Sequence, residues 1–107
     1  MTADRSTIRP KLTSNVSELI GNTPLIQLKK MSPIGGASIL AKLEFLNPGG
    51  SVKDRIALAM LVSAEQEGAL QDGVTVVEAT SGNTGIALAM LCAERNHKLI
   101  LTMPETM

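Results

Sequence analysis

The stretch VTVVEATSGNTGIALAMLCAERNHKLILTM, residues 74–103, decides the fold. Residues 74–79 form a short β-branched run, which predicts a strand. Residues 82–96 are rich in Ala, Leu and Met and predict a helix, and residues 98–103 predict a second strand. Because a strand, a helix and a strand follow in this order, we expect two parallel strands joined by a crossover helix.

The preceding residues continue this alternation. Residues 24–28 and 38–44 predict two short strands, with a pair of glycines at the turn between them. Residues 51–68 predict a helix that ends at a glycine. The order of elements therefore predicts an α/β fold with a parallel sheet and crossover helices.

Composition excludes several classes of partner. The chain has 107 residues, enough for one small domain, and ten basic residues balance ten acidic ones. This balance gives no reason to expect nucleic acid or an anionic membrane as a partner, and a single Phe without Trp or Tyr cannot stack on many bases. No apolar run reaches the roughly 20 residues of a membrane span.

The N-terminal residues and the single cysteine bear on the compartment. Residues 1–15 contain no apolar core of the kind that a secretory signal carries, and we expect them to form a loose N-terminal arm. Their Ser, Thr and Arg content leaves an organelle transit peptide as the alternative. Cys92 cannot form an intrachain disulfide and fits a reducing compartment, so a cytoplasmic protein is expected.

Two apolar helix bodies indicate that the chain is the front part of a larger protein. Residues 56–64 and 86–93 are apolar nearly all the way round, whereas a surface helix of a small protein has one apolar stripe. The sequence also stops at residues 101–107, directly after a predicted strand. The alternative is an oligomer that covers the second side of these helices.

The loop TSGNTG, residues 80–85, lies between a predicted strand and an apolar helix. In parallel sheets such loops gather at the carboxyl ends of the strands, where ligands bind. The start of a helix presents unpaired backbone N–H groups, to which hydroxyl and amide side chains of the loop add further donors. Because the loop carries no charge, it suits a carboxylate or phosphate held by neutral donors. The alternative is that these residues only cap the helix and form a turn.

A second loop, NPGGSVKDR, residues 47–55, supplies a reactive group. Ser51 and Asp54 resemble a capping box, which places Lys53 in the first turn of a helix. The helix dipole disfavours a cation there and so favours the neutral amine, which is a nucleophile and forms Schiff bases. The alternative is that Lys53 points into solvent or pairs with Asp54, Glu44 or another acid.

Other polar residues give weaker signals. His97, the only histidine, is expected at the end of a helix, and Cys92 is expected to fill the core. Asp72, Glu94 and Glu105 have no spacing typical of paired carboxylates. No metal-ligand cluster, P-loop or complete GxGxxG motif is found in the sequence.

Four motifs together closely resemble the cysteine synthases, or O-acetylserine sulfhydrylases. They are IGNTPLIQL, NPGGSVKDR, EATSGNTGIALA and LTMPETM, and the resemblance covers residues 16–107. These enzymes belong to the pyridoxal-phosphate-dependent β family. The resemblance implies a three-layer αβα arrangement of tryptophan synthase β-like fold type II, of which this chain would hold the N-terminal portion.

The resemblance also implies roles for individual residues. Lys53 corresponds to the lysine that binds pyridoxal 5'-phosphate covalently and later removes the substrate α-proton. The loop that closes on the substrate carboxylate corresponds to Thr80, Ser81, Gly82, Asn83 and Thr84, and Asn83 also bonds the ring hydroxyl of the cofactor. The family's glycine-rich phosphate loop and the serine facing the pyridine nitrogen lie beyond residue 107. This chain alone is therefore expected to be an inefficient enzyme.

The implied reaction converts O-acetylserine and sulfide to cysteine and acetate. Cystathionine β-synthase, which uses serine and homocysteine, is the nearest enzyme alternative, because GGSVKDR fits both. A non-catalytic fragment that binds a partner such as serine acetyltransferase is the alternative from another class. The resemblance further implies a homodimer for the complete protein.

Overall fold

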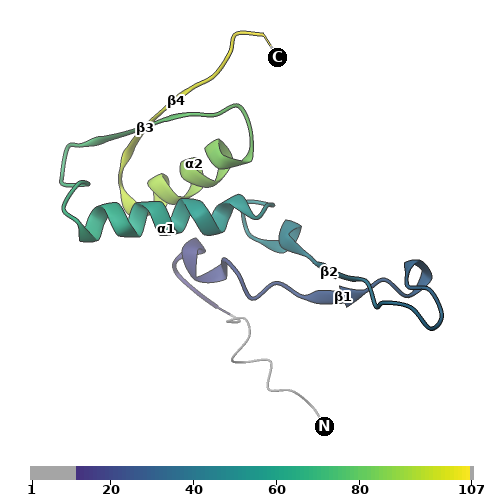
Figure 1. The fold of residues 1–107 in the computed structure, drawn as a ribbon. Helices are drawn as coiled ribbons and strands as arrows, with labels where there is room; N and C mark the ends of the chain where they lie inside the picture. Colours follow the sequence, from purple (N-terminus) through teal and green to yellow (C-terminus); the bar gives the residue numbers. More distant parts are fainter. Residues whose placement is uncertain (1–11, 107) are drawn as a thin grey trace.

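The computed structural model describes residues 12–106 (Figure 1). Its helices are α1 (Lys53–Gln66) and α2 (Asn83–Arg95), and its strands are β1 (Leu25–Gln27), β2 (Leu40–Lys42), β3 (Thr75–Ala79) and β4 (Lys98–Thr102). Short 3-10 helices lie at η2 (Val16–Leu19), η3 (Lys29–Met31) and η4 (Glu44–Leu46). Every predicted helix and strand is present, with each end within two residues of its expected position. Most of the predicted N-terminal arm, residues 1–15, lies outside the described residues.

Strands β3 and β4 form the parallel pair that the sequence predicts, with α2 as the crossover between them. Val76 and Leu99 pack against the buried residues of the two helices. On the opposite face Val77 and Ile100 are paired neighbours and remain 61% and 54% exposed. The described residues therefore hold two of the three expected layers, the helices and the sheet, and one sheet face is bare.

Strands β1 and β2 differ from the prediction of a single parallel sheet. They pair antiparallel, with Leu25 opposite Lys42, and form a separate two-stranded sheet. The connecting residues 28–39 contain no α-helix, and Gly36 N–H donates to the Pro33 carbonyl in a tight turn. A crossover between parallel strands is usually an α-helix, and because these residues form none the chain returns as a hairpin, which extends away from the helices (Figure 1).

The core lies between the two helices and the inner face of the β3–β4 sheet. It is built from small and aliphatic side chains, which allow the helices to approach closely. Cys92 is 1% exposed, as expected for a core residue, and its burial raises the pKa of the thiol. The other buried apolar residues are Ala57 and Leu61 of α1 and Ala87, Leu88 and Leu91 of α2. Apolar residues also remain exposed on both helices, including Ile56 and Ile86 at 50% and 54%.

A cluster of three polar side chains joins the last turns of the helices. The Arg95 guanidinium donates to both oxygens of Glu65, at 2.7 and 2.6 Å, and His97 Nε2 lies 2.8 Å from Glu65 Oε1. Glu65 is near the end of α1, and Arg95 is the last residue of α2. The helices therefore run in the same direction, as Figure 1 shows, and their first turns lie at the same end of the molecule.

The Glu65 cluster predicts a loss of stability in acid. The Arg95 hydrogen bonds, followed by that of His97, lower the pKa of Glu65 from 4.5 to about 2. A carboxyl with a lowered folded-state pKa stabilises the fold above its unfolded-state pKa, and this stabilisation is lost as pH falls from about 4.5 to about 2. We expect Glu65→Gln to reduce this pH dependence, measured as the urea midpoint at each pH.

The control for this prediction is Asp72→Asn. Asp72 is exposed and forms no ion pair with another described residue. Its replacement should leave the acid dependence unchanged. Arg55 also lowers the pKa of Glu44 to about 2. The part of the acid dependence of stability that comes from Glu44 should therefore remain in Glu65→Gln. If the urea midpoint of Glu65→Gln falls with decreasing pH as steeply as that of the wild type, the Glu65 cluster does not stabilise the fold.

Candidate functional site

The two predicted loops lie at the same end of the fold. Lys53 is the first residue of α1 and Asn83 the first of α2, and the two helices are parallel. The carboxyl ends of β3 and β4 are also at this end, because α2 follows β3 through the loop at residues 80–82 (Figure 1). Loops at this edge of a parallel sheet are the usual place for a ligand.

Lys53 has an exposed side chain without an internal partner. Its backbone N–H donates to Ser51 Oγ at 3.1 Å, whereas its amine forms no hydrogen bond or ion pair with any residue in the range 12–106. The two acids considered as partners are engaged elsewhere, Asp54 with Gly49 and Glu44 with Arg55. The amine is therefore free to react with a ligand.

The predicted capping box of Ser51 and Asp54 is wrong in its contacts. Val52, at the N-cap position of α1, forms no side-chain hydrogen bond, and Ser51 Oγ accepts from Lys53 rather than from Asp54. The Asp54 carboxylate is fully buried and accepts the Gly49 N–H at 2.6 Å. The reason is that the chain turns back sharply at the glycines, which brings the Gly49 amide to Asp54. The Asp54 carboxylate therefore holds the glycine turn against the start of α1.

The TSGNTG loop is fixed by its backbone while most of its side chains stay free. Thr80 N–H donates to the Thr102 carbonyl at 2.9 Å, and Thr80 Oγ1 accepts the Gly82 N–H at 3.3 Å. Gly82, the N-cap of α2, provides no side-chain cap. Within the described range the side chains of Ser81, Asn83 and Thr84 form no hydrogen bond. Capping does not account for these three polar side chains, which remain available to a ligand.

The glycines of this loop have different surroundings. A Cβ built on Gly85 would lie 2.9 Å from Thr80 Cγ2 and 3.1 Å from Leu101 Cδ1, whereas a Cβ on Gly82 would have no neighbour within 4 Å. Gly85 therefore lets α2 approach the protein's own strands. Gly82 lies in open space, and its backbone remains accessible.

Two hollows flank the loop. One, of about 390 Å³, is lined by Thr80 and Ser81 with Thr102, Met103 and Pro104. The other, of about 240 Å³, lies against the first turns of α2 and shares Thr80, Ser81 and Met103 with the first. The residues that follow β4 were not among the predicted site residues. The parallel pairing of β3 and β4 could have indicated them, since it places both strand ends side by side.

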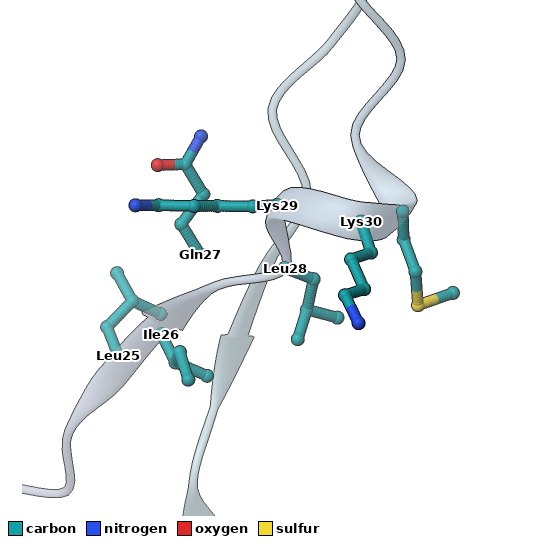
Figure 2. A pocket seen from close by; sticks show the side chains of 7 residues that line it. Leu25, Ile26, Gln27, Leu28, Lys29 and Lys30 are labelled. Atoms are coloured by element: carbon teal, nitrogen blue, oxygen red, sulfur yellow. The ribbon is translucent and has the colours of Figure 1, made fainter.

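Another hollow lies away from these loops. It measures about 670 Å³ and is lined by residues 25–31 of the hairpin (Figure 2). In Figure 2 the side chains of Leu28 and Lys30 point to the same side, and Lys29 points away from them. The hairpin extends away from both helices (Figure 1), and the lining of this hollow contributes only apolar, glutamine and lysine side chains. It adds no acid or base pair to the candidate site.

Two of the polar residues with weaker sequence signals, His97 and Glu94, form contacts within the chain itself. His97 contacts Glu65, and Glu94 accepts the Ser17 N–H at 2.9 Å and lies 4.0 Å from Arg95. Among residues 12–106, no three His, Cys, Asp or Glu side chains gather as metal ligands. No helix in this part of the chain is long and apolar enough to cross a membrane.

Known proteins resemble this chain in sequence and in fold. It is 53% identical over 97 residues to the cysteine synthase of Staphylococcus aureus (strain Mu50), covering 91% of this chain and 31% of the relative. A hydrogen sulfide-producing enzyme from Fusobacterium nucleatum superposes with a TM-score of 0.82 at 51% identity, over 91% of this chain and 32% of that enzyme. An O-acetylserine dependent cystathionine β-synthase from Helicobacter pylori gives 0.81 at 38%, over 89% and 32%. The chain thus spans about a third of the length of these relatives.

The side chains present fit pyridoxal phosphate in their chemistry. A primary amine without a partner can bind an aldehyde, and uncharged hydroxyl and amide donors can hold a carboxylate or a ring oxygen. Lys53 supplies the amine, and Ser81, Asn83 and Thr84 of the TSGNTG loop supply the hydroxyl and amide donors. The family described as pyridoxal-phosphate dependent enzyme matches residues 16–107. The chain therefore belongs to the family of pyridoxal-phosphate dependent enzymes.

Proposed function

We propose that this chain provides the lysine and the carboxylate-binding loop of a cysteine synthase, which converts O-acetyl-L-serine and sulfide to L-cysteine and acetate. The observation that carries the proposal is the shared position of two unpaired groups, the Lys53 amine and the side chains around Asn83, at parallel helix starts. The 53% identity to a cysteine synthase supports the choice of reaction. Residues 16–107 would form the incomplete N-terminal part, with residues 1–15 as an arm.

Each polar residue of the site has a proposed role. Lys53 would hold pyridoxal phosphate through its amine, and Asn83 would bond the ring hydroxyl. Thr80, Ser81, Gly82, Asn83 and Thr84 would bind the substrate α-carboxylate. Because these donors are neutral and lie at the start of α2, the helix dipole adds to their attraction for an anion.

The same residues account for proton transfer. Pyridoxal phosphate, when bound, supplies an aldehyde for the substrate amine and a ring system that accepts the electrons of the Cα–H bond. Lys53, once its amine is released, takes the α-proton as a general base, and acetate leaves from the β-carbon. Sulfide then forms the new bond to the β-carbon, Lys53 returns the proton to the α-carbon, and the loop at residues 80–84 holds the carboxylate throughout.

The complete protein is proposed to act in the cytoplasm as a homodimer. The loop that binds the carboxylate would also receive the C-terminal peptide of serine acetyltransferase, because such a peptide ends in a carboxylate. The competing proposals are an enzyme that forms cystathionine, which the Helicobacter pylori neighbour at 38% identity supports, and a fragment that binds a partner without turnover.

A chimera tests the proposed reaction. Residues 16–107 would replace the matching N-terminal third of the Staphylococcus aureus cysteine synthase, and cysteine formation from O-acetylserine and sulfide would be compared with cystathionine formation from serine or O-acetylserine and homocysteine. We expect the chimera to form cysteine faster than cystathionine. The 107-residue chain alone should form almost no cysteine. A folded chimera that forms only cystathionine, or neither product, would contradict the proposal.

A further inference from the structure

We propose that Arg55 is a positioning residue, whose ion pair with Glu44 fixes the first turn of α1 and thereby the direction in which Lys53 leaves the helix. This inference rests on the proposed role of Lys53 in binding pyridoxal phosphate. It assigns a positioning role to Arg55 and Glu44, which neither contact the loop at residues 80–84 nor carry the reactive amine.

The Arg55 guanidinium binds Glu44 through two nitrogens. Arg55 Nε donates to Glu44 Oε2 at 2.8 Å and Nη2 donates to Oε1 at 2.9 Å. Nη2 also lies 3.2 Å from Thr23 Oγ1, which donates to Glu44 Oε1 at 2.6 Å. Two parallel bonds fix the plane of the guanidinium as well as its distance, so this pair restrains orientation.

Buried residues at the base of the hairpin hold Glu44 in turn. Asn47 Nδ2 donates to Glu44 Oε2 at 2.9 Å, and Asn47 Oδ1 accepts the Gly21 N–H at 2.8 Å. Thr23 and Asn47 are 4% and 3% exposed, although Arg55 itself is partly exposed. The guanidinium also packs over Gly21, since a Cβ there would lie 3.1 Å from Arg55 Nη1. The Glu44 carboxylate is therefore held in place by Asn47 and Thr23, and its bonds to Arg55 fix the start of α1 relative to it.

Three consecutive residues at the start of α1 have three different surroundings. Lys53 is exposed without a partner, Asp54 is buried on the Gly49 amide, and Arg55 is bound to Glu44. Side chains two residues apart leave an α-helix in nearly opposite directions, at about 200°. Because Lys53 has no side-chain contact of its own, the backbone of this turn sets its direction, and Asp54 and Arg55 hold that backbone.

Selective labelling of the 107-residue chain tests this role. The chain would be incubated with pyridoxal phosphate, reduced with borohydride and digested, and the labelled fraction of Lys53 would be compared with that of Lys30. Lys30 is exposed on η3 of the hairpin (Figure 2) and serves as an internal reference. We expect Arg55→Ala to lower the Lys53-to-Lys30 ratio by about tenfold, since a ~1 Å misplacement costs up to about a hundredfold in rate. Arg55→Lys, which cannot bind both oxygens in one plane, should lower the ratio less.

Arg95→Ala is the matched control. Arg95 also binds a glutamate of α1 through two bonds, but at the opposite end of the helix, on Glu65. Its loss should lower the urea midpoint without changing the Lys53-to-Lys30 ratio. The comparison separates a local positioning effect from a general loss of stability, because both variants remove one bidentate ion pair from α1.

The outcomes distinguish the two proposals. If wild-type Lys53 is labelled no more than Lys30, the proposed role of Lys53 fails and the inference falls with it. If wild-type Lys53 is preferred and Arg55→Ala keeps that preference, Arg55 has no positioning role. The same conclusion follows if Arg95→Ala lowers the ratio as much as Arg55→Ala at an equal loss of stability.

Discussion

Lys53→Ala is expected to abolish borohydride-stable attachment of pyridoxal phosphate at the start of α1 and to abolish cysteine formation by the chimera. The proposed mechanism assigns both the covalent hold and the removal of the α-proton to this one amine. Alanine leaves the first turn of α1, which otherwise begins with Asp54 and Arg55, without an amine. The loss should therefore reach at least about 10³-fold, by analogy with removal of an essential nucleophile or base.

The stability of this variant should move in the opposite direction. Lys53 is exposed, without a side-chain partner among the described residues, at the positive end of the α1 dipole. Replacing a cation there with alanine removes an unfavourable charge, which should raise the free energy of unfolding by about 0.3–1 kcal/mol. Loss of labelling together with an unchanged or higher urea midpoint would identify a chemical role rather than a folding defect.

Lys30→Ala provides the control for that experiment. Lys30 is exposed on the hairpin, so an aldehyde in solution can also reach its amine. Its replacement should remove one labelled peptide and leave labelling of Lys53 and the activity of the chimera unchanged. Normal cysteine formation by the Lys53→Ala chimera would overturn the assignment of the lysine, whatever the labelling pattern.

Local patterns in the sequence predicted the elements that place the candidate loops. Helix-forming composition marked both helices, and short apolar or β-branched runs marked the strands, all to within two residues, because each signal is contained in a few neighbouring side chains. The order of β3, α2 and β4 then required parallel strands, which placed the TSGNTG loop at a carboxyl edge. The place of Lys53 in a first helix turn suggested a reactive amine, whereas its binding of pyridoxal phosphate and the roles of Asn83 came from the resemblance to cysteine synthases.

Contacts between distant residues could not be predicted in this way. The network around Glu44 joins Thr23 to Arg55 across 32 positions, and nothing in either local sequence specifies the partner. The contact between Asp54 and Gly49 depends on how sharply the glycine turn folds back, which a capping motif does not describe. Met103 entered the candidate site only because β4 ends beside β3.

Gly85→Val is expected to destabilise the fold strongly and to disturb the TSGNTG loop. Gly85 is buried, and even a Cβ there would lie 2.9 Å from Thr80 Cγ2 and 3.1 Å from Leu101 Cδ1. The two further methyl groups of valine must push α2 away from the strands. Overpacking of this kind costs about 1–3 kcal/mol, and we expect the upper end of that range in urea unfolding.

Two smaller changes separate crowding from the helix propensity of the new residue. Gly85→Ala adds only the Cβ, whose contact with Thr80 opposes the gain of about 1 kcal/mol from replacing glycine within a helix. Thr80→Ser removes the crowded methyl group and keeps the hydroxyl that accepts the Gly82 N–H. The double variant should therefore be more stable than the sum of the single changes predicts.

Ala89→Val is the control within the same helix. Ala89 is exposed one turn after Gly85, so valine there should cost only the difference in helix propensity, about 0.5 kcal/mol. If Gly85→Val and Ala89→Val cost the same, close approach of α2 to β3 and β4 is not what requires glycine. If Gly85→Val is the more costly and Thr80→Ser relieves Gly85→Ala, the packing of Gly85 against Thr80 holds the loop in place. The direction of the free side chains of Ser81 and Asn83 then depends on a glycine that never has to contact a ligand.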